Sequence, residues 1–111
     1  MIRFIENLYV GDLAARKKKT YIRMIRKGKS QPDLYIITYA ASGRDMLDIL
    51  PTRCLHQKFI RDRLPEIVGI AVGKEEAIGL FRKMVRDCFR KTGGCNVKEY
   101  LQSLDPFEEE T

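Results

Sequence analysis

Apolar and polar residues alternate along the chain in a pattern that predicts strands and helices in turn. β-branched, aromatic and other apolar residues are dense at 4–10, 34–40, 46–50 and 67–72, and turn-forming residues flank these runs, which is typical of strands. Apolar residues at helical spacing predict helices between the first and second runs, between the third and fourth, and after the last. The predicted order is βαββαβ, followed by one or two helices.

Turn and cap residues define several boundaries of these elements. Ser42-Gly43 separates the second and third runs, and a Gly there supplies the positive φ of a tight turn, so these strands should pair antiparallel. The continuous apolar run at 67–72 is expected for a strand in the middle of a sheet. Gly93 should end the long helix that follows, and Asn96 and Glu99 form a capping-box-like pair before a last short helix.

Two of the predicted helices have a definite set of core residues. In the short helix after Pro51, Leu55 and Phe59 lie one turn apart and should share a face. The long helix, with Glu75 and Glu76 in its first turn, has a stripe that obeys the i, i+3, i+4, i+7 rule. The members of this stripe are Ala77, Ile78, Phe81, Met84, Val85, Cys88 and Phe89.

The predicted order indicates an α+β fold, a ferredoxin-like βαββαβ sheet with helices on one face and an extra C-terminal helix. We expect residues 1–104 to form this single domain, because the chain has the length of one domain and no linker or repeat divides it. Residues 105–111, which carry four acidic side chains, should be a flexible tail. A fold of this kind does not by itself indicate a function.

The segment from Asp12 to Gly28 predicts a basic amphipathic helix. Asp12 is placed to cap its first turn, and Gly28 supplies the left-handed residue that ends a helix. At 100° per residue, an apolar side formed by Ala14, Tyr21 and Ile25 opposes a side made of cations. The cations of this basic face are Arg16, Lys19, Arg23, Arg26 and Lys27.

The distribution of charge makes this helix the distinctive part of the sequence. The chain has a formal net charge of +6, but residues 1–30 hold nine Lys or Arg against two acidic residues. Eight cations with no acid occur between Arg16 and Lys29. Cations about one turn apart suit the repeating phosphates of a nucleic acid, and they are also common on solvated helix surfaces.

Composition limits the class and location of the protein. Apolar residues make up 44% and charged residues 32%, values of a folding globular chain. The apolar runs are shorter than the ~20 residues that cross a bilayer, and the N-terminus lacks the long apolar stretch of a secretory signal. Three cysteines without a paired spacing do not indicate a disulfide framework. We therefore expect a cytoplasmic protein with reduced thiols and without membrane contact.

Candidate metal and nucleophile sites are weak. Cys54 and His56, with Cys88 and Cys95, could supply four zinc ligands, but their spacings differ from those of zinc modules and Cys88 falls on an apolar stripe. A Cys54 nucleophile with His56 as base is disfavoured, since residues two apart on a helix point to different faces. We predict no metal, no cofactor and no catalytic residue.

A pair of glycines is a further candidate for a phosphate-binding loop. Gly69 and Gly73 bracket a strand-to-helix junction, where backbone amides can bind an anion. The spacing matches neither dinucleotide-binding nor P-loop patterns, and Glu75 and Glu76 place carboxylates where a phosphate would lie. The glycines are better interpreted as sites of close packing, and an enzyme is not indicated.

Two resemblances accompany these patterns. Leu8-Tyr9-Val10-Gly11-Asp12-Leu13 resembles the first-strand motif of the RNA-recognition motif, which implies base stacking by Tyr9, but the third-strand aromatic motif of that family is missing and a core role for Tyr9 is favoured. Segments beginning at Arg26 (RKGKSQPDLYIITY), Ile67 (IVGIAVGKEEA) and Thr92 (TGGCNVKEYL) resemble small uncharacterised bacterial proteins. That resemblance covers most of the chain and implies the size and class of the domain, but no activity or site residue.

The sequence therefore favours a non-catalytic protein that binds nucleic acid or another polyanion through its basic face, with Arg53 and Arg61 as further contacts. The alternative is a protein-interaction module. In that case the edge of the sheet or the C-terminal helix would mediate self-association or partner docking, and the basic face would attract an acidic protein.

Overall fold

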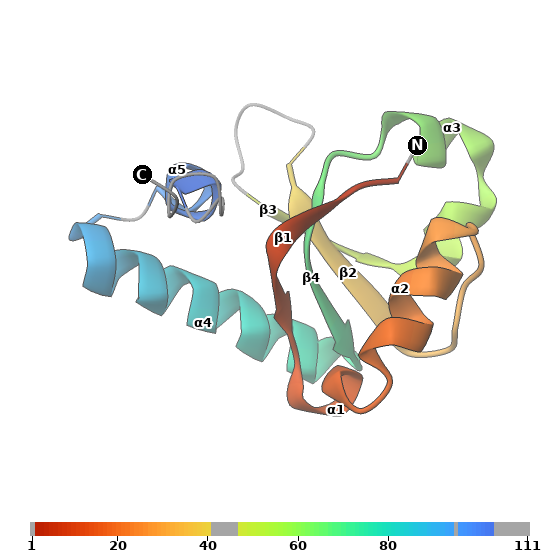
Figure 1. The fold of residues 1–111 in the computed structure, drawn as a ribbon, viewed down its shortest axis with the longest axis horizontal. Coiled ribbons are helices and arrows are strands. Elements are labelled where there is room, and N and C mark those ends of the chain that lie inside the picture. The colour runs from red at the N-terminus through yellow and green to blue at the C-terminus, as the bar shows by residue number, and fades with distance from the viewer. Residues whose placement is uncertain (1, 41–46, 95, 104–111) are drawn as a thin grey trace.

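The computed structural model describes residues 2–40, 47–94 and 96–103, and it contains a four-stranded mixed sheet (Figure 1). Its strands are β1 (Phe4–Val10), β2 (Leu34–Tyr39), β3 (Leu47–Pro51) and β4 (Ile67–Val72). The spatial order is β1-β4-β2-β3; β4 is parallel to β1 and antiparallel to β2, which pairs antiparallel with β3. The α+β class and the central place of the last strand are confirmed. The ferredoxin-like arrangement is not, because β4 lies between β1 and β2.

The helices of the described chain follow the predicted order, with two of them divided. They are α1 (Asp12–Ala15), α2 (Lys18–Arg26), the 3-10 helix η1 (Thr52–His56), α3 (Lys58–Arg63), α4 (Lys74–Thr92) and α5 (Val97–Ser103). None of the described helices is both long and apolar enough to cross a membrane. The predicted Ser42-Gly43 turn and acidic tail lie outside the described residues.

Helices cover both faces of the sheet, so the prediction that they lie on one face was wrong. Along β2, Leu34 and Ile36 belong to a core cluster with α1, α2 and η1, whereas Ile37 and Tyr39 belong to a second cluster with α4 and α5. Successive strand residues point to opposite faces, and this strand is buried along both, so each face needs its own layer of helices (Figure 1).

The predicted helix from Asp12 to Gly28 is interrupted at Arg16 and Lys17. Lys17 has φ −131° and ψ 34°, which ends α1 and begins α2. The interruption falls in a run of four cations, where like charges one turn apart disfavour a continuous helix. Gly11, not Asp12, is the N-cap of α1.

Two predicted core faces differ in detail from the structure. On α4 the buried residues are Ala77, Leu80, Met84 and Cys88, whereas Ile78 and Phe89 are exposed. The helix after Pro51 divides into η1 and α3, so Leu55 is fully buried while Phe59 is 63% exposed. A break of one residue was enough to move Phe59 off the shared face.

Candidate polyanion site

Helix α2 is held on the sheet by its apolar side and by a defined C-terminus. Ile25 is fully buried, and Tyr21 and Ile22 pack partly buried against the same core cluster. Gly28 has φ +72°, and its N–H donates to Ile25 O at 2.9 Å. The N–H of Lys29 donates to Met24 O, also at 2.9 Å. This is the Schellman arrangement, which ends α2, and the burial of Ile25 determines which side of the helix faces outward.

The outward side of α2 gathers four of the five predicted cations around one shallow hollow. All five cations are exposed, but Arg16 lies in the interruption before α2 and does not line the hollow. The hollow has a volume of about 430 Å³. We call it the α2 hollow; its lining residues are Lys19, Ile22, Arg23, Arg26 and Lys27.

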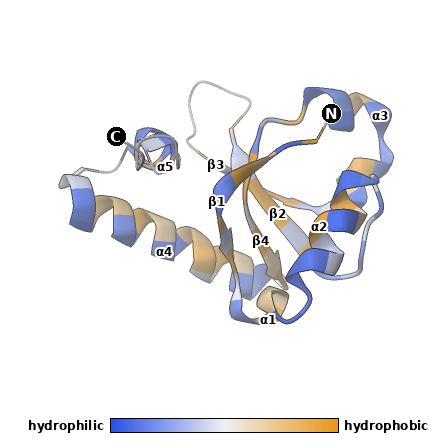
Figure 2. Cartoon of the chain, viewed as in Figure 1, coloured by the Kyte–Doolittle hydropathy of each residue, from blue (hydrophilic) through white to orange (hydrophobic). Residues whose placement is uncertain are grey.

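The cations of the α2 hollow carry charge that no described carboxylate neutralises. The one ion pair in the described part of the chain joins Lys58 and Asp62 on α3. Figure 2 shows the hydrophilic outer side of α2 against the apolar strands behind it. An uncompensated group of cations attracts polyanions and holds them by releasing their counterions.

The two further arginines do not join this hollow. The guanidinium of Arg61 donates to Leu55 O at 2.7 Å and packs against Gly28, so it serves as a structural contact between α3 and the end of α2. Arg53 is exposed and lines a separate hollow with residues 30–35, which include the start of β2. Neither side chain therefore lines the α2 hollow, and their contact with a polyanion stays a prediction.

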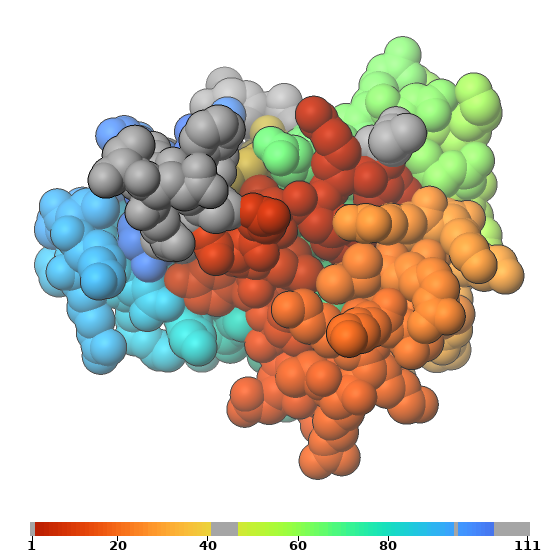
Figure 3. Space-filling model, in the orientation of Figure 1, coloured from red at the N-terminus to blue at the C-terminus, as the bar shows by residue number. Residues whose placement is uncertain are grey.

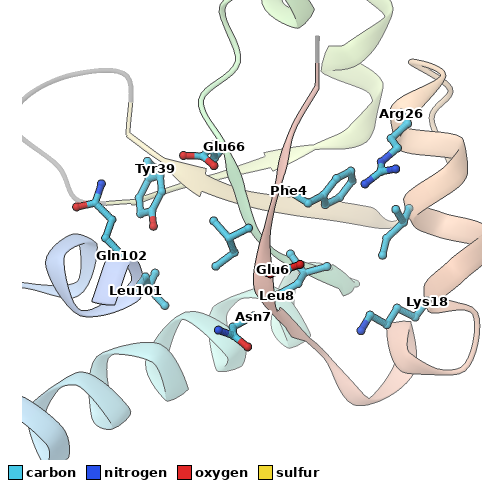
Figure 4. Close-up of a pocket in the computed structure, with 12 residues that line it drawn as sticks. Phe4, Glu6, Asn7, Leu8, Lys18, Arg26, Tyr39, Glu66, Leu101 and Gln102 are labelled. Carbon is cyan, nitrogen blue, oxygen red and sulfur yellow. The ribbon is translucent and has the colours of Figure 1, made fainter. Parts of the chain in front are cut away.

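Beside the α2 hollow, a second and larger hollow runs along the outer edge of β1. It has a volume of about 720 Å³. β1 lies at the surface beside α2 (Figure 3), with α5 on its other side (Figures 1 and 4). Between Phe4 and Tyr9 the pairing of β1 with β4 shifts register. We call this hollow the β1 groove; it is lined by Phe4, Ile5, Glu6, Asn7, Leu8, Lys18, Ile22, Arg26, Tyr39, Glu66, Leu101 and Gln102.

The β1 groove has basic and aromatic side chains on its α2 side and a mixed charge along its length. On the α2 flank, the guanidinium carbon of Arg26 lies 5.3 Å from the centre of the Phe4 ring, and Lys18 reaches toward the strand (Figure 4). Carboxylates of Glu6 and Glu66 also line the groove, so its charge is mixed while that of the α2 hollow is positive. The positively charged α2 hollow therefore lies next to a groove of mixed charge.

Tyr39 lines the groove from the side of α5. Its hydroxyl is buried and has no hydrogen-bond partner among the described residues. Burial, with the nearby Glu66 carboxylate as a second cause, raises the pKa of Tyr39 to about 12. At neutral pH the hydroxyl is therefore protonated.

The sequence did not reveal the β1 groove, although one signal for it was present. Glu6 and Asn7 interrupt the apolar pattern of β1, and polar residues in mid-strand are typical of an edge strand with a solvent-facing side. That Phe4 would lie under Arg26 depends on how α2 packs, which the local sequence does not determine.

The other candidate residues have structural contacts. Tyr9 donates its hydroxyl hydrogen to Asp87 Oδ2 at 2.7 Å and packs against the core cluster of α4, so the base-stacking role implied by the RNA-recognition motif is contradicted. Cys88 is buried, with Sγ 3.4 Å from the carbonyl of Gly94. Within the described residues no three His, Cys, Asp or Glu side chains converge as metal ligands; Cys95 lies outside them.

An exposed Ser30–His56 contact was not predicted. Ser30 Oγ lies 2.8 Å from His56 Nε2, the spacing of a nucleophile and its base. In the part of the chain that the structure describes, no carboxylate hydrogen-bonds the other ring nitrogen, and both residues are at the surface. The pair joins the loop after α2 to the end of η1.

The strand-to-helix junction between Gly69 and Gly73 contacts a carboxylate of the same chain, that of Glu76. Glu76 accepts hydrogen bonds from the N–H groups of Val72 at 2.9 Å, Leu13 at 2.8 Å and Ala14 at 3.3 Å. Its carboxylate thus occupies one amide of the junction and two amides at the N-terminus of α1.

Comparison with known proteins found no matching protein-family model, no matching curated protein and no matching solved structure.

Proposed function

We propose that the protein binds a polyanion, most simply a nucleic acid, through the α2 hollow, without catalysing a reaction on it. The observation that supports this function is the convergence of Lys19, Arg23, Arg26 and Lys27 on one exposed hollow with no described carboxylate paired to any of them. Solvated lysines and arginines scattered over a surface would not share a common concavity. A phosphate backbone offers the evenly spaced negative charges that such a group accommodates.

The rigid support of α2 favours this function further. The Schellman end at Gly28 and the buried Ile25 hold the backbone, so the Cα positions from which the cations extend are fixed relative to one another. A preorganised group of charges loses less conformational freedom on binding than charges on a loop.

The test is a binding titration with a charge-reversed protein and a matched control. We expect the double variant Arg23→Glu, Lys27→Glu to bind a fluorescent oligonucleotide at low salt at least about tenfold more weakly than wild type, because favourable phosphate contacts become repulsive. Fluorescence anisotropy measures the affinity, and circular dichroism verifies folding.

The matched control is Arg82→Glu, Arg86→Glu, which makes the same change of net charge on exposed positions of α4. It should retain affinity close to that of wild type. Equal weakening by both double variants would show that net charge alone acts, and would contradict a site on α2.

A further inference from the structure

The α2 hollow and the β1 groove meet, because Ile22 and Arg26 line both. We propose that the polyanion is a single-stranded nucleic acid whose phosphates lie along the α2 hollow while a base enters the β1 groove against Phe4 and Arg26. This inference rests on the proposed function and narrows its ligand from polyanions in general to strands with unpaired bases.

The Arg26–Phe4 pair supplies the contact that a base requires. The guanidinium lies 5.3 Å from the ring centre, and Phe4 is half-buried at the wall of the groove (Figure 4). Unpaired bases stack on aromatic rings and on the planes of arginine guanidinium groups. Because Arg26 lines both hollows, one side chain can contact a phosphate or a base at the point where the strand passes from one to the other.

The edge of β1 adds polar groups that can contact the rim of a base. In the described sheet β1 has one neighbouring strand, β4, so its other edge faces the groove. The exposed carboxylate of Glu6 accepts hydrogen bonds, and exocyclic amines of bases donate them. The volume of about 720 Å³ falls in the roughly 300–1,000 Å³ range of small-ligand sites.

A single strand fits this surface better than a duplex or an acidic peptide. A duplex keeps its bases stacked inside and would use the cations of α2 but leave the groove beside them empty. An acidic peptide added along β1 would meet the carboxylates of Glu6 and Glu66 as well as the cations. A strand that carries phosphates on one side and bases on the other matches a positive hollow next to a mixed, aromatic groove.

The experiment compares four probes on the full chain: a short single strand, the duplex of the same sequence, inorganic polyphosphate and poly-glutamate. We expect the single strand to bind at least about fivefold more tightly than the duplex or polyphosphate at equal phosphate concentration, since base stacking adds to the phosphate contacts. Poly-glutamate should bind more weakly than the single strand.

Two variants test the stacking contact itself. Phe4→Leu removes the ring. Arg26→Lys keeps the charge but removes the guanidinium plane, and it tests the stacking contact even if Phe4→Leu is unstable. Phe4→Leu should weaken single-strand binding at least about fivefold and leave polyphosphate binding unchanged. Arg26→Lys should weaken single-strand binding by a larger factor than it weakens polyphosphate binding, because the lysine keeps a charge for the phosphates but has no plane for a base. Phe59→Leu is the control, because Phe59 is exposed and carries Arg63 4.0 Å above its ring but lies outside the groove.

The outcomes separate this inference from the proposed function. If no probe binds through α2, the proposed function fails as well. If duplex, polyphosphate and single strand bind equally, or Phe4→Leu and Arg26→Lys bind the single strand like wild type, only the inference of base contact is overturned. Tighter binding of poly-glutamate than of the single strand would instead indicate an acidic protein partner, and it would also overturn the inference of base contact.

Discussion

At the scale of single residues, Glu76 joins parts of the chain that are far apart in sequence. Its carboxylate accepts N–H groups of Leu13, Ala14 and Val72, and a side chain at Gly11 would overlap it. Sequence reasoning placed Glu76 correctly in the first turn of α4. The prediction that Asp12 caps the helix at α1 missed this contact, because a hydrogen bond spanning 63 positions leaves no local signal.

We predict that Glu76→Gln lowers the free energy of unfolding by about 1–3 kcal/mol, because an amide cannot accept all three backbone N–H groups and leaves donors unsatisfied. Glu75→Gln, at the exposed neighbouring position, should change it by less than about 0.5 kcal/mol. Denaturant unfolding measures both. Equal effects of the two variants would mean that the hydrogen bonds to Glu76 contribute nothing beyond the general charge of the first turn.

At the scale of elements, the periodic patterns predicted the existence and type of the helices and strands well, and predicted their boundaries less well. The four strands, the long helix α4 ending at Gly93 and the capping pair before α5 are confirmed, with Asn96 Oδ1 accepting from the N–H of Glu99 at 3.2 Å. The interruption at Arg16 and the division after His56 were missed. Both are breaks of one or two residues, which a periodicity averaged over a longer window does not resolve.

The end of α2 gives a prediction at this scale. Gly28→Ala should lower the free energy of unfolding by about 1–2 kcal/mol, because its φ of +72° is unfavourable for a residue with a Cβ and that Cβ would lie 3.0 Å from Arg61 Cδ. In contrast, Gly79→Ala, in the exposed middle of α4 with open space around it, should stabilise by about 0.5–1 kcal/mol. Thermal unfolding compares the two. A Gly28→Ala variant as stable as Gly79→Ala would contradict the fixed end of α2.

At the scale of the whole molecule, the sequence predicted the composition of the sheet but not its arrangement. Continuous apolar residues at 67–72 indicated a central strand, yet its neighbours depend on pairings across 29 to 63 residues, for which a single sequence has no pattern. The same limit applies to the site. Helical spacing identified the cations of α2, whereas the β1 groove arises from packing β1 between α2 and α5, elements far apart in sequence.

The central claim is that α2 holds a polyanion through individual phosphate contacts, and the salt dependence of binding tests it most directly. The logarithm of the association constant should fall linearly with the logarithm of salt concentration, and Arg23→Gln, Lys27→Gln should reduce that slope by about 1.4 for a single strand, since each lost cation removes about 0.7. The matched variant Arg82→Gln, Arg86→Gln should keep the wild-type slope. An unchanged slope in the α2 variant, with binding retained, would contradict the assignment of the phosphate contacts to α2.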